Sequence, residues 1–193
     1  MALTPSTMLA LKTKAPDFSL SDVVLDKKIS LATFVSRGGV TPPVLVMFIC
    51  RHCPYVQHVK EELSRLGRDY QNRKLGIVAI SSNDAENYTD DSPASLKEFA
   101  KEIGLSYPLC YDESQSVAKA YTAACTPDFF LFDAKRELVY RGQMDDSRPG
   151  NGKPVTGKDL RDAIAAVLSG KPVSSKQRPS MGCNIKWKPG HAA

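Results

Sequence analysis

Residues 46–56 read V-M-F-I-C-R-H-C-P-Y-V and contain two cysteines three positions apart. The apolar run over 44–49 is typical of a strand that is buried on both faces. After it, apolar residues recur at spacings of three and four over 56–70, which predicts a helix that begins near the proline. The stretch therefore places Cys50 at the end of a strand and Cys53 in the first turn of a helix.

This position favours redox chemistry. A helix N-terminus carries about half a positive charge, which stabilises a thiolate and lowers its pKa. Arg51 and His52, between the two cysteines, can add positive charge beside the sulfur. We expect a lowered pKa at the first thiol, Cys50, and a lowered pKa stabilises the reduced form, which makes the pair more oxidising.

Two other uses of a cysteine pair fit the sequence less well. A structural zinc site usually needs four ligands, but only one such pair is present, and Cys110, Cys125 and Cys183 stand alone. A structural disulfide between Cys50 and Cys53 would close a very short loop and constrain the unfolded chain little. We therefore interpret the pair as a redox catalyst.

The other elements can be predicted from apolar periodicity and turn residues. Strands are expected at 75–80, 128–133 and 137–141, and helices at 95–103, 114–121 and 156–167. This order implies an α/β protein with a central mixed β-sheet flanked by helices. We expect a single domain over 1–193, with 171–193 as a C-terminal tail that packs on it.

Composition excludes several classes of function. The chain has 193 residues, 42% of them hydrophobic and 24% charged, and a net charge of +5 that is scattered along the sequence. Without a basic cluster we expect no nucleic-acid partner. No stretch approaches the roughly 18 apolar residues that cross a bilayer, and the N-terminus lacks the pattern of a secretory signal. We therefore expect a cytoplasmic protein without a membrane partner.

Four segments resemble the thioredoxin-like superfamily, and specifically its redoxin branch of alkyl hydroperoxide reductase/thiol-specific antioxidant proteins. They are A-P-D-F-S-L at 15–20, F-I-C-R-H-C-P-Y-V at 48–56, Y-D-E-S-Q-S-V-A-K-A-Y at 111–121 with T-P-D-F-F-L-F-D at 126–133, and S-M-G-C-N-I-K-W at 180–187. The last resembles the C-terminal signature of a peroxiredoxin-like subgroup. The resemblance implies a thioredoxin-like fold with an N-terminal redoxin extension.

The resemblance also assigns roles by position. Cys50 would be the exposed nucleophile that attacks a substrate disulfide, and Cys53 would resolve the mixed disulfide. Pro127 would be a cis-proline facing the pair, and Thr126 would offer backbone groups to an extended substrate. Met47 stands where thioredoxins carry a buried acid, so a water or the neighbouring histidine would have to move the proton. No cofactor is expected beyond the redox-active disulfide, and the partners would be a disulfide or peroxide substrate and a thiol electron donor.

Two alternatives stay open at this point. Cys53-Pro54 matches the peroxide-attacking cysteine of peroxiredoxins, which gives a thiol peroxidase as the second reading, with Arg141 or Arg148 in place of the activating arginine. The third reading is a copper or zinc carrier that uses Cys50, Cys53 and His52. Cys183 and Cys125 are possible accessory thiols in the redox readings.

Overall fold

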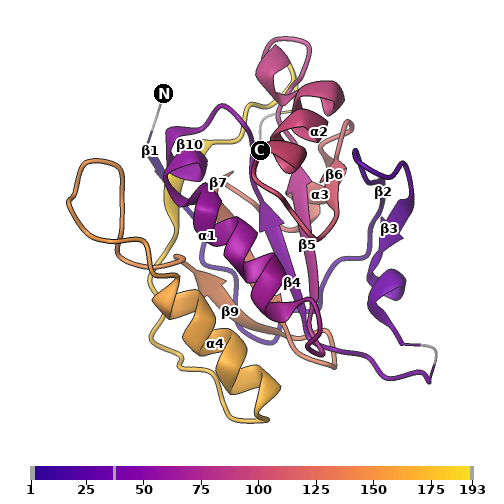
Figure 1. Ribbon diagram of the computed structural model, residues 1–193, viewed down its shortest axis with the longest axis vertical. Helices are drawn as coiled ribbons and strands as arrows, with labels where there is room; N and C mark the ends of the chain where they lie inside the picture. Colours follow the sequence, from indigo (N-terminus) through magenta and orange to yellow (C-terminus); the bar gives the residue numbers. More distant parts are fainter. Residues whose placement is uncertain (1–2, 37, 192–193) are drawn as a thin grey trace.

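The computed structural model describes residues 3–36 and 38–191 and is built around a five-stranded sheet of order β6-β5-β4-β8-β9. The strands are β4 (Val44–Phe48), β5 (Gly76–Ser81), β6 (Leu109–Tyr111), β8 (Asp128–Phe132) and β9 (Leu138–Gly142). The central strand β4 is parallel to β5 and antiparallel to β8. The predicted mixed sheet is therefore confirmed, with β6 as an additional edge strand (Figure 1).

Helices cover both faces of this sheet. The helical elements are η1 (Leu31–Phe34), α1 (Pro54–Tyr70), η2 (Thr89–Asp91), α2 (Pro93–Glu102), α3 (Ser116–Ala120) and α4 (Lys158–Leu168). α1, α2 and α4 pack on one face, and Figure 1 shows α1 crossing in front of the strands with α4 below β9. The other face is covered by α3 and by the N-terminal hairpin of β2 (Ser19–Ser21) and β3 (Lys28–Ser30).

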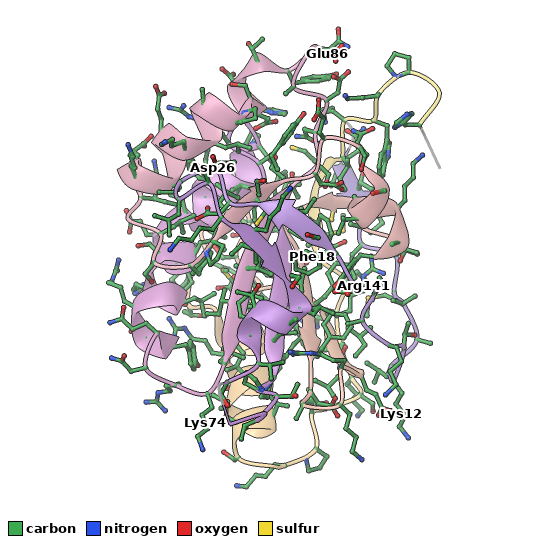
Figure 2. The ribbon with its side chains drawn as sticks, turned by 90° about the vertical axis from the view of Figure 1, so that its right-hand side faces the viewer. Lys12, Phe18, Asp26, Lys74, Glu86 and Arg141 are labelled. Carbon is green, nitrogen blue, oxygen red and sulfur yellow. The ribbon has the colours of Figure 1, made fainter. Side chains whose placement is uncertain are left out.

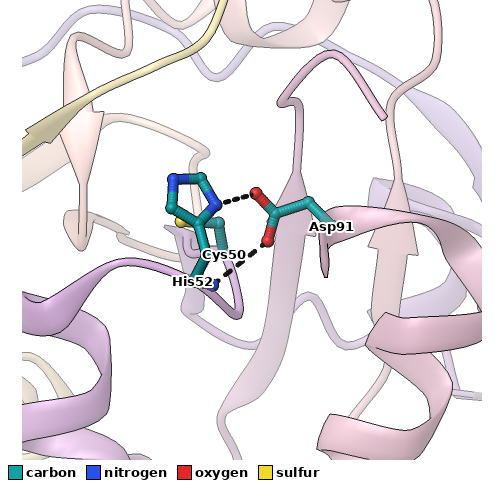
Figure 3. Close-up of side chains that lie close together, drawn as sticks. All are labelled: Cys50, His52 and Asp91. Carbon is teal, nitrogen blue, oxygen red and sulfur yellow. Dashed lines mark hydrogen bonds and ion pairs between the residues drawn. The ribbon is translucent and has the colours of Figure 1, made fainter. Parts of the chain in front are cut away.

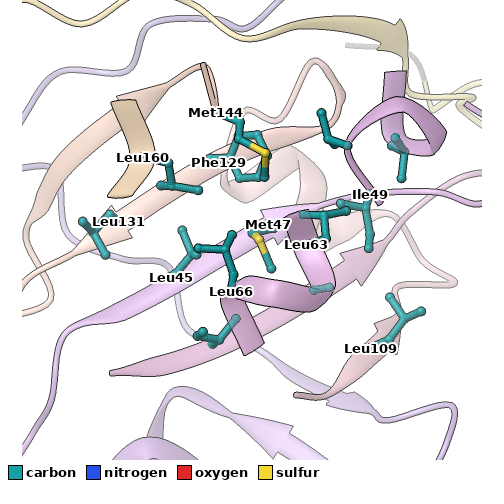
Figure 4. Close-up of a cluster of buried hydrophobic side chains, with 14 of the residues drawn as sticks. Leu45, Met47, Ile49, Leu63, Leu66, Leu109, Phe129, Leu131, Met144 and Leu160 are labelled. Atoms are coloured by element: carbon teal, nitrogen blue, oxygen red, sulfur yellow. The ribbon is translucent and has the colours of Figure 1, made fainter. Parts of the chain in front are cut away.

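Two hydrophobic cores follow from the alternation of side chains along β4. Leu45 and Met47 point into the core beneath α1 (Figure 4), and Val46 and Phe48 point into the second core. Phe18 lies over the middle of that second face, whereas charged residues such as Lys12, Lys74 and Glu86 lie at the periphery (Figure 2). The sheet is thus buried on both sides, and the end of β4 leads directly into the cysteine pair.

A second small sheet was not predicted. It joins β1 (Leu3–Pro5), β10 (Met181–Asn184) and β7 (Cys125–Thr126), with β10 in the middle and antiparallel to both neighbours. The C-terminal tail therefore returns to the strand that precedes Pro127. In the part of the chain that the structure describes, no helix is long and apolar enough to cross a membrane.

Candidate active site

Both motif cysteines are buried where β4 meets α1, so Cys50 is not the exposed nucleophile that the resemblance implies. Cys50 follows β4 and is 1% exposed, and Cys53 is the N-cap of α1 and is 0% exposed. The Thr126–Pro127 bond is cis, as the resemblance implies. The Thr126 hydroxyl lies 3.2 Å from the Cys50 sulfur, and the Cys53 sulfur lies 3.2 Å from the Thr126 carbonyl oxygen.

The thiol with the lowered pKa is Cys53 and not Cys50, contrary to the sequence-based expectation. A hydrogen bond from the Cys50 thiol lowers the pKa of Cys53 to about 5 against the effect of burial, and the Cys183 thiol and the Val56 N–H act in the same direction. The pKa of Cys50 is well above its usual value, because its proton is held between the two sulfurs, because it is buried and because the Asp91 carboxylate is near. The helix start thus stabilises charge on the cysteine that caps it.

His52 is held by Asp91, a buried carboxylate at the end of η2. The His52 Nδ1 and Asp91 Oδ2 atoms are 2.5 Å apart, and Arg51 N–H donates to Asp91 Oδ1 at 2.7 Å. Asn83 donates to the same carboxylate at 2.7 Å. The hydrogen bond to Asp91 raises the pKa of His52, and although burial alone would raise the pKa of Asp91, these donors hold it below its usual value.

The imidazole also lies beside the first thiol. The ligand atoms of Cys50, His52 and Asp91 are all within 4.8 Å of one another, and Figure 3 shows the Cys50 sulfur just behind the His52 ring. On its outer side the ring stacks on Tyr88, with 5.6 Å between ring centroids. His52 therefore separates Cys50 from the half-exposed surface around Tyr88.

Arg51 does not act on the sulfurs as predicted. Its guanidinium donates to the Ser95 hydroxyl at 2.7 Å and to Glu98 at 3.2 Å, both on α2. The side chain thus points to α2, and only its backbone N–H takes part in the site. The positive charge that the sequence assigned to two residues comes from His52 alone.

The tail brings Cys183 into the site, whereas Cys125 stays in the core. Cys183 lies on β10 directly across from Thr126 and is in hydrogen-bond contact with Cys53. Burial raises the pKa of Cys183 to about 12. Cys125 is fully buried, its thiol faces the Pro127 carbonyl oxygen at 3.7 Å, and burial raises its pKa far above the usual value.

Because β10 pairs with Thr126, that edge is not free for an extended substrate, contrary to the expectation from the resemblance.

Neither arginine considered for peroxide activation reaches the thiols. The Arg141 guanidinium is buried and donates to Asp128 at 3.1 Å and to the Thr122 carbonyl oxygen at 2.7 Å. The Arg148 guanidinium donates to the Asp145 carbonyl oxygen and to Gln143, both at 2.6 Å. Both guanidinium groups therefore bind these partners and not the thiols.

A family model described as the AhpC/TSA family matches residues 11–141, which include the cysteine pair and Pro127. The chain belongs to the AhpC/TSA family.

Three relatives illustrate how this AhpC/TSA protein compares with known ones. Thiol-disulfide oxidoreductase ResA of Bacillus thuringiensis is 24% identical over 126 residues, which are 65% of this chain and 65% of ResA, so the match spans less than two thirds of that relative. The structure of an uncharacterized conserved protein from Geobacillus kaustophilus is 50% identical, with a TM-score of 0.94 over 98% of both chains. A thiol:disulfide interchange protein of the thioredoxin family from Chlorobium tepidum has a TM-score of 0.61 at 19% identity, over 83% of this chain and 99% of its own, and shows the thioredoxin-like fold.

Sequence reasoning missed Asp91. It lies 39 residues after His52, in a short polar stretch, and no spacing pattern links it to the cysteine pair. One signal was present, because Met47 leaves the position of the usual buried acid apolar and an acid from elsewhere could serve instead. Within this AhpC/TSA protein, η2 supplies that acid.

Proposed function

We propose that this protein is a thiol–disulfide oxidoreductase that exchanges disulfides through Cys50 and Cys53. The observation that supports it most is the placement of the two cysteines at the junction of a buried strand and a helix start, where both sulfurs lie 3.2 Å from oxygen atoms of Thr126. Thiolate character at one sulfur is what disulfide exchange requires. The similarity to ResA, by its name a thiol-disulfide oxidoreductase, agrees with this proposal.

In the proposed reaction Cys50 receives the substrate. It passes its proton to the Cys53 thiolate and attacks one sulfur of the substrate disulfide, which breaks the substrate S–S bond and forms a mixed disulfide. Cys53 then loses its proton and attacks Cys50, which closes the Cys50–Cys53 bond and releases the second substrate thiol. The substrate gains two electrons that the dithiol loses, and a thiol donor reverses the change.

His52 and Asp91 are proposed to move the proton in this reaction. The imidazole is close enough to Cys50 to stabilise its thiolate and to protonate the departing substrate sulfur. Asp91 fixes the ring through Nδ1 and favours the charged form. A group whose pKa lies near the working pH is the most effective acid and base.

The test is the redox equilibrium of the protein in glutathione buffers, followed by thiol alkylation and mass spectrometry. Because the lowered pKa of Cys53 stabilises the dithiol, we expect a potential above the roughly −270 mV of thioredoxin. A Cys50→Ser variant should not form the Cys50–Cys53 bond or reduce a model disulfide. A potential at or below that of thioredoxin would contradict the role given to the thiolate, and absence of the bond would contradict the function.

A thiol peroxidase is the second candidate, favoured by one observation. Cys53 caps α1 directly before Pro54, and its pKa of about 5 makes it a thiolate at neutral pH. Against it, Arg141 and Arg148 are held elsewhere. Addition of hydrogen peroxide with a sulfenic-acid trap separates the readings, because a peroxidase must be trapped rapidly at Cys53. Unchanged peroxide consumption by Cys53→Ser would exclude it.

Metal transport is the third candidate, with a ligand set that differs from the predicted one. The donor atoms that lie together are those of Cys50, His52 and Asp91, and sulfur, imidazole and carboxylate ligands suit zinc. Protein purified without chelators should carry one metal ion per chain if this reading holds.

For the redox reading we propose a cytoplasmic setting, no further cofactor and an unidentified thiol donor.

A further inference from the structure

The position of Cys183 is set by its pairing with β7. In the antiparallel register Cys183 lies directly opposite Thr126, and side chains of directly opposed residues lie on the same face of a sheet. The Thr126 hydroxyl on that face is 3.2 Å from the Cys50 sulfur. Neighbouring residues on a strand point to opposite faces, so Cys125 is directed away from this cluster.

Gly182 makes the close approach of β10 possible. A Cβ atom at this position would lie 2.0 Å from the Thr126 carbonyl oxygen and 2.7 Å from the Thr126 carbonyl carbon. Any side chain would therefore push β10 away from the loop before Pro127. Gly182 therefore allows the Cys183 thiol to reach Cys50 and Cys53.

Cys53 is the common partner of two thiols. Its sulfur accepts hydrogen bonds from both Cys50 and Cys183, and all three side chains are at most 4% exposed. We propose that Cys183 is a third redox thiol, which exchanges with the Cys50–Cys53 disulfide to form a Cys53–Cys183 disulfide. This inference rests on the proposed function, because it takes the Cys50–Cys53 bond as its starting point.

The exchange needs no external oxidant. The Cys183 thiol attacks the Cys53 sulfur, which forms the Cys53–Cys183 bond and breaks the Cys50–Cys53 bond, and the proton that Cys183 loses is balanced by the one that Cys50 gains. Cys50 leaves as a thiolate beside His52, which can return a proton to it. The molecule stays oxidised by two electrons throughout.

The location explains what such an exchange would do. β10 occupies the Thr126 edge, where an extended substrate is expected in this fold, and it places a cysteine there. Cys183 is thus an internal thiol substrate of the pair. Its bond to Cys53 stores the oxidised state in the interior and releases Cys50 as a free thiol.

The test is a map of disulfides in Cys50→Ser after oxidation of the reduced protein with diamide, by digestion and mass spectrometry without reduction. We expect a Cys53–Cys183 bond at a yield at least about tenfold above any bond from Cys53 to Cys125 or Cys110. The matched control is Cys50→Ser with Cys183→Ser, which should keep Cys53 reduced. Gly182→Ala added to Cys50→Ser should lower the yield several-fold, and circular dichroism shows whether each variant is folded.

The outcomes separate the two levels of the proposal. If wild type forms the Cys50–Cys53 bond and folded Cys50→Ser leaves Cys53 and Cys183 reduced, the third-thiol proposal is overturned while the proposed function stands. If Cys50→Ser forms the Cys53–Cys183 bond but wild type never forms the Cys50–Cys53 bond, the thiols are coupled and the proposed oxidoreductase reaction fails. Formation of both bonds supports both proposals.

Discussion

At the scale of single residues, Cys50 and Cys53 differ in the partners that their sulfurs contact. The Cys50 and Cys183 thiols and the first turn of α1 lower the pKa of Cys53, whereas Cys50 lies near the carboxylate of Asp91. The sequence indicated a charged sulfur at a helix start, but it could not tell which of two neighbouring sulfurs would be stabilised. That depends on Asp91 and Cys183, which only the tertiary fold brings to the site.

Asp91→Asn tests the proton-moving role of His52. Loss of the carboxylate removes the interaction that raises the pKa of His52, so this pKa should fall towards its usual value. We expect the rate of disulfide exchange at neutral pH to fall by at least about tenfold, with the histidine-dependent part of the pH–rate profile moved to lower pH. Stopped-flow kinetics with a model disulfide and NMR titration of His52 measure the two effects.

The control for this variant is Asp90→Asn, because Asp90 is the exposed neighbour of Asp91. It should leave both the rate and the titration unchanged. If Asp91→Asn slows the reaction but the pH profile keeps its position, Asp91 acts only by holding the loop in place, and the proposed proton route is wrong.

At the scale of elements, the sequence predicted the helices and strands whose apolar residues recur with a clear period. The observed bounds lie within about three residues of the predicted ones for β4, β5, β8, β9, α1, α2 and α4. Long apolar runs and amphipathic helices can be recognised from the local sequence alone. β1, β7 and β10 have two to four residues each, too few to show a pattern. Their pairing joins the two ends of the chain to the Pro127 loop, which no local sequence feature encodes.

An ion pair between β8 and β9 supports that loop. The side chains of Asp128 and Arg141 are both 0% exposed, and Asp128 Oδ2 lies 3.1 Å from Arg141 Nη2. The same carboxylate accepts from the Ala124 N–H, and the Arg141 guanidinium donates to Thr122. This pair therefore fixes the segment that leads into β7 and the cis peptide bond.

Arg141→Met should destabilise the protein strongly. It leaves the Asp128 carboxylate buried without its partner, a change that costs about 3–5 kcal/mol. Burial already raises the pKa of Asp128 to about 6, so protonation should reduce the loss at pH 5 relative to pH 8. Urea unfolding at the two pH values measures this. Lys14→Met, which breaks an exposed pair with Glu137, should cost less than about 1 kcal/mol, and equal losses for both variants would contradict the prediction.

At the scale of the whole molecule, burial and reactivity are linked. The sheet is covered on both faces, and the three thiols of the site are as buried as the cores beside them. A thiolate in such a place is stabilised by the folded structure and not by water, since the unfolded chain offers neither the helix start nor the neighbouring thiols. The charge state of Cys53 must therefore appear in the free energy of unfolding.

In the reduced protein, that free energy should therefore depend on pH. The pKa of Cys53 is about 5 in the folded state and near its ordinary value of 9.0 when the chain is unfolded. A lowered pKa contributes stability that is complete above the unfolded value and is lost as the pH falls through the folded value. The stability of wild type relative to Cys53→Ser should thus increase from pH 5 to pH 8, by at least about 1 kcal/mol.

Urea unfolding of wild type and Cys53→Ser in a phosphine reductant gives this difference, and taking the difference removes the contributions of groups such as His52 and Asp128 that titrate in the same range. Cys110→Ser is the matched control, because burial raises the pKa of Cys110 to about 12 and its thiol stays protonated throughout. Its stability difference from wild type should not vary with pH. If the Cys53→Ser difference is equally constant, the negative charge does not reside on Cys53, and the proton of Cys50 must pass to another base, such as His52, when Cys50 attacks the substrate.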